Sequence, residues 1–226
     1  MSEFDSYASE YDNALAQGIS VSGEDKDYFA RGRVDWVMKC LKSRGEMPHR
    51  ALDFGCGTGT TIPLLIEGGM QQAVGLDTSE KSLEVARTLH RLPGVSFANT
   101  AEYRPDGSVD LAFCNGVFHH IPPAERRDAL DFIRASLRPK GIFAFWENNP
   151  WNPGTRYVMS RIPFDRDAIT LSVLEARALV QTSGFNILRT DFLFVFPRFL
   201  KPLRVLEPTL SRLPLGAQYG ILCQKT

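Results

Sequence analysis

Short apolar runs alternate with amphipathic segments along most of this chain. Buried strands bounded by turn residues are predicted at 51–54, 72–76, 95–98, 109–114 and 142–146. Between them, apolar residues at helical spacing predict helices over 60–66, 80–90 and 124–137. Strands that alternate with helices indicate an α/β fold around an open, mainly parallel sheet.

Further elements are expected on both sides of this pattern. A turn at 138–141 ends the helix over 124–137. Ser172 is an N-cap with Glu175 at the capping-box position, so another helix begins there. The remaining elements expected are helices over 27–43 and 172–182 and strands over 187–196 and 218–224.

The first strand contains Asp53 and breaks into three alternating glycines, Gly55, Gly57 and Gly59. Glycine permits positive φ and lets a ligand approach the backbone. A dinucleotide loop would read G-x-G-x-x-G, whereas the third glycine here comes one residue early. Asp53 would repel a pyrophosphate, but it suits a ligand with an ammonium and a sulfonium. The stretch therefore favours S-adenosylmethionine.

A second acid, Asp77, ends the strand over 72–76 and precedes Thr78 and the next helix. An acid about 20 residues past the glycines is placed to accept both ribose hydroxyls of a nucleoside. The alternative is an α/β domain with a tight turn and an Asp N-cap.

Together these segments resemble motifs I and II of the class I S-adenosylmethionine-dependent methyltransferases, of the type 11 and 12 kind. The resemblance is nearest to bacterial ubiquinone and polysaccharide biosynthesis methyltransferases, and it extends over about 4–225. It implies a Rossmann-like, seven-stranded sheet with helices on both faces and an antiparallel last strand. The cofactor-binding residues expected are Asp53, Gly55, Cys56, Gly57, Gly59, Asp77, Thr78, Thr100, Ala101, Glu102, Asn115, Gly116 and Val117.

Thr100 departs from the family pattern, which has an acid at the adenine-binding position. Its hydroxyl can still bond the adenine amino group, and Asn99 or Glu102 are alternatives.

The stretch 115–121 resembles motif IV of the family, N-x-x-x-H-H-[ILV]. His120 or His119 is a candidate general base, because imidazole titrates near neutrality. The alternative is that His120 only fixes the loop, since methyl transfer from a sulfonium does not require a base. Glu147, at the end of the next strand, is a third catalytic candidate, and Asn148 and Trp151 are candidate substrate contacts.

The N-terminal segment 1–48 resembles the helical lid of many small-molecule methyltransferases, which implies that Tyr11 faces the active site. The alternative is that this segment is an amphipathic helix that only covers the sheet. Active-site insertions are expected at 150–168 and 197–217. The second of these is proline-rich, basic and apolar. It would pack over its own active site, contact a membrane surface, admit a lipid-linked substrate or form a dimer contact.

Composition narrows the classes of protein. At 226 residues the chain suits one domain, 1–226, and its 43% hydrophobic content is ordinary for a globular protein. A net charge of +0 gives no field to collect nucleic acid. The four cysteines are scattered, so neither a disulfide framework nor a metal site is expected. With no signal peptide and no long apolar run, a cytoplasmic location is expected.

The sequence therefore predicts a methyltransferase that acts on oxygen or nitrogen of a small-molecule or lipid- or sugar-linked acceptor. A non-catalytic S-adenosylmethionine-binding or scaffold protein is the alternative. An NAD-dependent oxidoreductase is less favoured, because the chain lacks the glycine spacing and a Tyr-x-x-x-Lys pair. The acceptor and the oligomeric state are not fixed by the sequence.

Overall fold

The computed structural model describes residues 17–165 and 168–226. Its helices and strands, in chain order, are η2 (Ser20–Ser22), α2 (Lys26–Ser43), β1 (Arg50–Phe54), α3 (Thr61–Glu67), β2 (Gln72–Asp77), α4 (Glu80–Leu89), β3 (Val95–Asn99), β4 (Val109–Asn115), α5 (Arg126–Ser136), β5 (Leu137–Asn148), α6 (Pro153–Arg161), η3 (Pro163–Asp165), α7 (Val173–Thr182), β6 (Phe185–Leu193), η4 (Arg198–Leu206), α8 (Glu207–Leu210) and β7 (Gln218–Lys225). The predicted N-terminal lid segment before residue 17, with Tyr11, lies outside the described residues.

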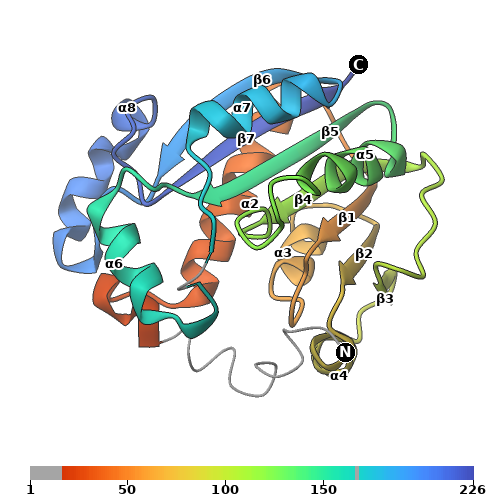
Figure 1. The fold of residues 1–226 in the computed structure, drawn as a ribbon, viewed down its shortest axis with the longest axis horizontal. Helices are drawn as coiled ribbons and strands as arrows, with labels where there is room; N and C mark the ends of the chain where they lie inside the picture. Colours follow the sequence, from red (N-terminus) through yellow and green to blue (C-terminus); the bar gives the residue numbers. More distant parts are fainter. Residues whose placement is uncertain (1–16, 166–167) are drawn as a thin grey trace.

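Seven strands form one sheet in the order β3-β2-β1-β4-β5-β7-β6 (Figure 1). β1 pairs in parallel with β2 and β4, and β5 pairs in parallel with β4. β7 is antiparallel to both β5 and β6, which confirms the predicted last strand. The order reverses between β1 and β4, and ligands of such sheets bind beyond the carboxyl ends of the strands near that point.

Two apolar clusters hold helices on the two faces of the sheet. On one face, side chains of α2 and α3 such as Val37 and Leu65 pack on β1, β4 and β5. On the other face, side chains of α5 and α7 such as Ile133 and Val180 pack on the same strands and on β6 and β7. Each strand therefore has apolar residues on both faces, which explains the continuous apolar runs in the sequence.

The predicted turn at 138–141 is wrong, because these residues belong to β5. The pairing of β4 with β5 shifts between Val109 and Leu111, whose partners are Leu137 and Ile142. Lys140 has a positive φ of 61° within this irregularity. The turn residues thus form a bulge in a longer strand instead of a separate connection.

Other predicted boundaries hold to within a few residues. The capping box at Ser172 and Glu175 is present and begins α7. β6 starts and ends before the predicted 187–196, since Phe194 has a φ of 63° that breaks the extended backbone.

The segment with α6 and the segment with α8 both lie beyond the carboxyl end of β5 (Figure 1). Asn149, just after β5, links the first segment to the end of the second, since its side-chain amide donates to the carbonyls of Pro214 and Gly216 at 3.1 and 2.8 Å. No helix of the described residues is long and apolar enough to cross a membrane.

Candidate active site

The glycine turn follows β1 directly. Gly55, Gly57 and Gly59 have φ of 74°, 52° and 83°, and the N–H groups of Gly55 and Cys56 donate to the Leu76 carbonyl. A Cβ on Gly57 would meet no atom within 4 Å, so the backbone is open to a ligand at that residue. The turn thus provides the close approach that the glycine spacing predicts.

Two carboxylates flank this turn. Asp53 is only 3% exposed, and burial raises its pKa to about 7, with Arg33 lowering it and Asp77 raising it. Asp77 accepts the Gly57 N–H at 2.8 Å through one oxygen and the Ser79 N–H at 2.8 Å through the other. Ser79, not Asp77, is the N-cap of α4, which corrects the alternative interpretation of Asp77. Asp77 instead connects the glycine turn to the end of β2.

The loop after β3 is held by Asn99. Its side-chain oxygen accepts the Ala101 N–H at 3.0 Å, and its amide donates to the Thr78 carbonyl at 3.3 Å. The Thr100 N–H donates to the Asp77 carbonyl. These bonds tie the loop 100–102 to the end of β2, where Asp77 and Thr78 lie.

The end of β4 lies against the glycine turn. A Cβ on Gly55 would lie 2.3 Å from a methyl of Val117, so the two segments touch. Gly116 has a φ of 66° and donates its N–H to the Trp146 carbonyl. The buried side-chain oxygen of Asn115 has no hydrogen-bond partner among the described residues. A buried polar atom without a partner is costly, so it marks a place where a ligand donor would fit.

Glu147 lies behind His119. It is 1% exposed; one oxygen accepts the Phe118 N–H at 2.7 Å and the other lies 2.6 Å from His119 Nδ1. The sequence predicts Glu147 as a catalytic candidate, but in the structure its buried carboxylate contacts the Phe118 N–H and His119. Glu147 therefore positions His119.

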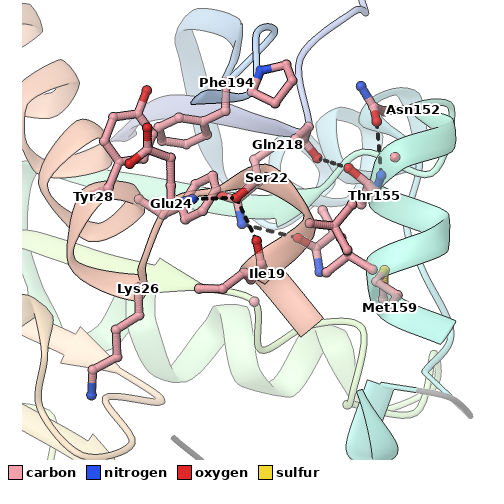
Figure 2. A pocket seen from close by; sticks show the side chains of 18 of the residues that line it. Ile19, Ser22, Glu24, Lys26, Tyr28, Asn152, Thr155, Met159, Phe194 and Gln218 are labelled. Carbon is pink, nitrogen blue, oxygen red and sulfur yellow. Dashed lines mark hydrogen bonds between the residues drawn. The ribbon is translucent and has the colours of Figure 1, made fainter. Parts of the chain in front are cut away.

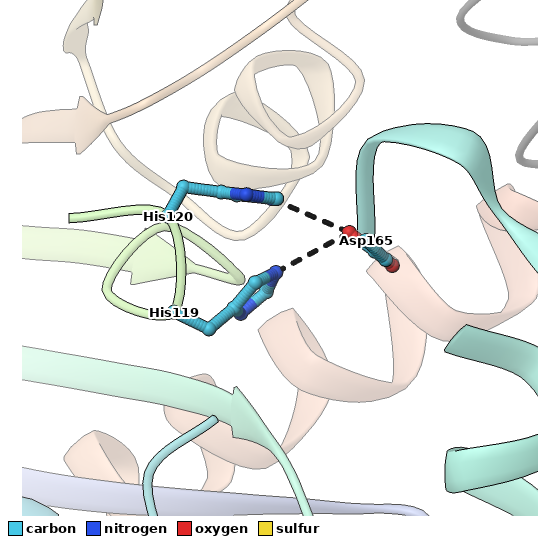
Figure 3. Close-up of side chains that lie close together, drawn as sticks. All are labelled: His119, His120 and Asp165. Carbon is cyan, nitrogen blue, oxygen red and sulfur yellow. Dashed lines mark ion pairs between the residues drawn. The ribbon is translucent and has the colours of Figure 1, made fainter. Parts of the chain in front are cut away.

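Asp165, from η3, completes the group (Figure 3). Its Oδ1 lies 3.4 Å from His119 Nε2 and 3.3 Å from His120 Nε2. Burial alone would lower the pKa of His119, but the carboxylates of Glu147 and Asp165 raise it to about 10. Burial would raise the pKa of Asp165, but hydrogen bonds from both histidines lower it. The sequence analysis did not identify Asp165. The only sequence signal for it is that it lies within the active-site insertion expected at 150–168.

A cavity of about 360 Å³ opens beside these residues (Figure 2). Its walls are mostly apolar and aromatic, and they come from the chain around η2, α2, α6, η3 and η4. Among the lining side chains are Ile19, Tyr28, Phe29, Met159, Phe164, Phe194 and Phe199. Polar groups at the cavity include His120, Asp165 and Asn148, whose side-chain oxygen accepts from Gln218 at 3.1 Å.

Trp151 does not belong to this cavity. Its side chain is 48% exposed and does not line the cavity walls. The Trp151 N–H donates to the Asn149 side chain, which is itself tied to the 214–216 backbone. The loop therefore turns Trp151 outward, and the structure gives no support for its predicted substrate contact.

The sheet order and the glycine turn define the class I methyltransferase fold. Residues 52–145 match the family model described as a methyltransferase domain. This match agrees with the methyltransferase family and the S-adenosylmethionine cofactor expected from the sequence.

Two named relatives illustrate the sequence similarity. The chain is 38% identical over 98 residues to a trans-aconitate 2-methyltransferase of Rhizobium rhizogenes, covering 42% of this chain and 37% of that protein. It is 45% identical over 100 residues to one of Acidovorax sp., covering 43% and 37%. The matches thus span just over a third of the length of these curated relatives.

Solved structures agree with the fold over nearly the whole chain. Magnesium protoporphyrin IX methyltransferase from Synechocystis, with bound SAH, has a TM-score of 0.65 at 18% identity, covering 99% of this chain and 96% of that chain. A possible histamine N-methyltransferase from Thermotoga maritima has a TM-score of 0.65 at 20% identity, covering 99% and 98%. At these identities the likeness shows the fold.

Proposed function

We propose that this chain transfers a methyl group from S-adenosylmethionine to oxygen or nitrogen of a small organic acceptor. The observation that supports this most is at the end of β4. Val117 touches the glycine turn, and Asn115 and Gly116 line the cavity. A cofactor on the turn and an acceptor in the cavity would therefore meet at one strand end.

The residues around the turn fit the cofactor. Asp77 would hold the ribose, and Thr78, Thr100, Ala101 and Glu102 the adenine side. Asp53, the three glycines and Cys56 would hold the methionine end, with Asn115, Gly116 and Val117 as the floor. The open backbone at Gly57 and the unpartnered Asn115 oxygen both leave room for ligand groups. When bound, S-adenosylmethionine supplies an electrophilic methyl group on a sulfonium leaving group.

The cavity suits a small acceptor with an apolar or aromatic body. About 360 Å³ lies at the lower end of the range for small-molecule sites. Relatives named trans-aconitate 2-methyltransferase, matched over 42% of this chain, support a small carboxylic acid as the acceptor. Arg204 also lines the cavity, but its guanidinium already pairs with Glu24 at 3.0 Å and donates to the Phe196 carbonyl, so it does not by itself favour an acidic acceptor.

The histidines contribute position and charge at the acceptor end. His119, with its pKa raised to about 10, carries a proton at neutral pH and is not a base in that state. Of the two predicted bases, this leaves His120, which is partly exposed to the cavity and held by Asp165. Fixed side chains that align the acceptor supply much of the acceleration in such transfers.

Thermal unfolding with candidate ligands tests this function. A ligand at 100 times its Kd stabilises the folded state by about 2.7 kcal/mol, or about 5–11 °C for a domain of this size. S-adenosylmethionine and S-adenosylhomocysteine are expected to produce that shift, and NAD none. A shift with NAD alone would contradict the proposal.

Turnover separates an enzyme from a binding protein. With small carboxylic acids, including trans-aconitate, and phenols as acceptors, we expect one of them to release S-adenosylhomocysteine. Cofactor binding without product on any acceptor would favour the non-catalytic alternative.

A further inference from the structure

His119, His120 and Asp165 offer three metal-ligand atoms at one point of the cavity wall. One ligand atom from each residue lies within 4.8 Å of the others. Figure 3 shows both imidazoles pointing toward the Asp165 carboxylate from the loop after β4. All three residues line the cavity, so the cluster is accessible from it.

The two Nε2–Oδ1 distances are long for hydrogen bonds and fit the spacing of ligand atoms in a coordination shell, and the three ligand atoms all lie within 4.8 Å of one another. Nε2 of His119 and of His120 lie 3.4 and 3.3 Å from Asp165 Oδ1. Charge-assisted hydrogen bonds are shorter, at about 2.7–2.9 Å. In a tetrahedral site with bonds of about 2.0–2.1 Å, neighbouring ligand atoms lie about 3.3–3.4 Å apart.

The support behind His119 is also typical of a metal ligand. Its Nδ1 lies 2.6 Å from the buried Glu147 carboxylate, which the Phe118 N–H holds in place. With the Nδ1 proton donated to Glu147, His119 Nε2 faces the cluster, and metal binding there would release the Nε2 proton. Metal-bound histidines commonly donate their other ring nitrogen to such a carboxylate, which fixes the ring and the tautomer.

We propose that His119 Nε2, His120 Nε2 and an oxygen of Asp165 bind a divalent transition-metal ion such as Zn²⁺. Two imidazoles with one carboxylate suit such ions, whereas Mg²⁺ and Ca²⁺ prefer all-oxygen shells. Three protein ligands leave a coordination position that faces the cavity. With an ion bound, His120 Nε2 would be a ligand and not a base; if the proposed methyl transfer holds, an acceptor oxygen would occupy the open position and the ion would lower its pKa. Metal binding itself does not depend on that function.

The test is metal titration of the full, untagged chain after chelation, without cofactor. Zn²⁺ is followed by calorimetry, and Co²⁺ by its visible absorption, which reports coordination number and nitrogen ligands. We expect one equivalent of each ion to bind. Asp165→Asn and His120→Ala are expected to abolish binding, and His49→Ala, an exposed histidine away from the cavity, to leave it unchanged.

Glu147→Gln tests the positioning role. It keeps the three ligands but loses the carboxylate behind His119, so we expect binding about 10- to 100-fold weaker and a shifted Co²⁺ spectrum. A purely structural role would leave that spectrum unchanged in the fraction that binds.

Two results would overturn the proposal. One is no saturable binding of either ion below about 100 µM. The other is binding that Asp165→Asn and His120→Ala, each shown to be folded by circular dichroism, leave intact. The cluster would then be an ion-pair network that fixes the loop. Cofactor binding, measured separately on the same preparation, distinguishes this failure from failure of the proposed function.

Discussion

Asp53→Asn is expected to stabilise the cofactor-free protein at alkaline pH and to weaken binding of the cofactor. Asp53 is 3% exposed at the end of β1. Burial raises its pKa from 3.8 to about 7, because the charged form is poorly solvated there; Arg33 lowers the pKa and Asp77 raises it. A buried carboxylate lowers the stability of the folded protein, but it would bind a cationic ligand group, which explains why Asp occupies this position.

Proton binding by Asp53 sets how the stability of the folded protein changes with pH. Between pH 3.8 and about 7 the folded protein keeps a proton that the unfolded chain has lost, so stability falls as pH rises through this window. A rise from 3.8 to about 7 corresponds to a penalty of about 4 kcal/mol above pH 7. Asn carries no charge but adds N–H donors that need partners, so we expect a net gain of about 2–4 kcal/mol.

Urea unfolding of the wild type and Asp53→Asn at pH 4, 6 and 8.5, without cofactor, measures this difference. The advantage of the variant is expected to be zero or slightly negative at pH 4, because only the cost of the added donors remains there, and largest at pH 8.5. Asp131→Asn, at a half-exposed residue of α5 that lies 3.7 Å from Arg134, is the control and should change stability by less than about 0.5 kcal/mol. A variant that is less stable at pH 8.5, or equally stabilised at every pH, would refute the reasoning.

Three further predictions concern other parts of the fold. Gly57→Ala, with no neighbour within 4 Å of the new Cβ, is expected to cost about 1 kcal/mol through its positive φ, yet to abolish cofactor binding in calorimetry. Ser172→Ala removes the capping box of α7 and should lower stability by about 1 kcal/mol in urea unfolding, with cofactor affinity unchanged. A peripheral membrane contact through 197–217 is a proposal favoured by Val205 and Leu206, which are 79% and 46% exposed and do not line the cavity. The wild type should then sediment with anionic phosphatidylglycerol vesicles, and the double variant Val205→Ser, Leu206→Ser should not. No sedimentation of the wild type would contradict the proposal.

The segments proposed to hold the cofactor can be recognised in the sequence because their signals are local. A strand, an acid and three glycines stand together in the sequence, and Asp77 follows the next strand at the expected distance. Parallel pairing of β1 with β2 then brings these segments to the same sheet edge without further information.

The acceptor side depends on tertiary contacts that the sequence does not display. Glu147 ends a strand like a substrate contact, yet the fold places His119 over it. Asp165 reaches the histidines from a distant segment, and Asn149 turns Trp151 outward by binding the 214–216 backbone. The prediction of a turn at 138–141 is wrong for the same reason, a tertiary contact: pairing with β4 makes these residues part of a bulged strand.

The most direct test of the account is calorimetric titration of the wild type, Asp77→Asn and Asp131→Asn with S-adenosylmethionine and S-adenosylhomocysteine. Hydrogen bonds to a charged group contribute about 1.5–3 kcal/mol. We therefore predict one site in the wild type and in Asp131→Asn, and affinity about 10- to 100-fold lower in Asp77→Asn. No binding by the wild type, or equal affinity in Asp77→Asn, would contradict a cofactor site built on the glycine turn and Asp77.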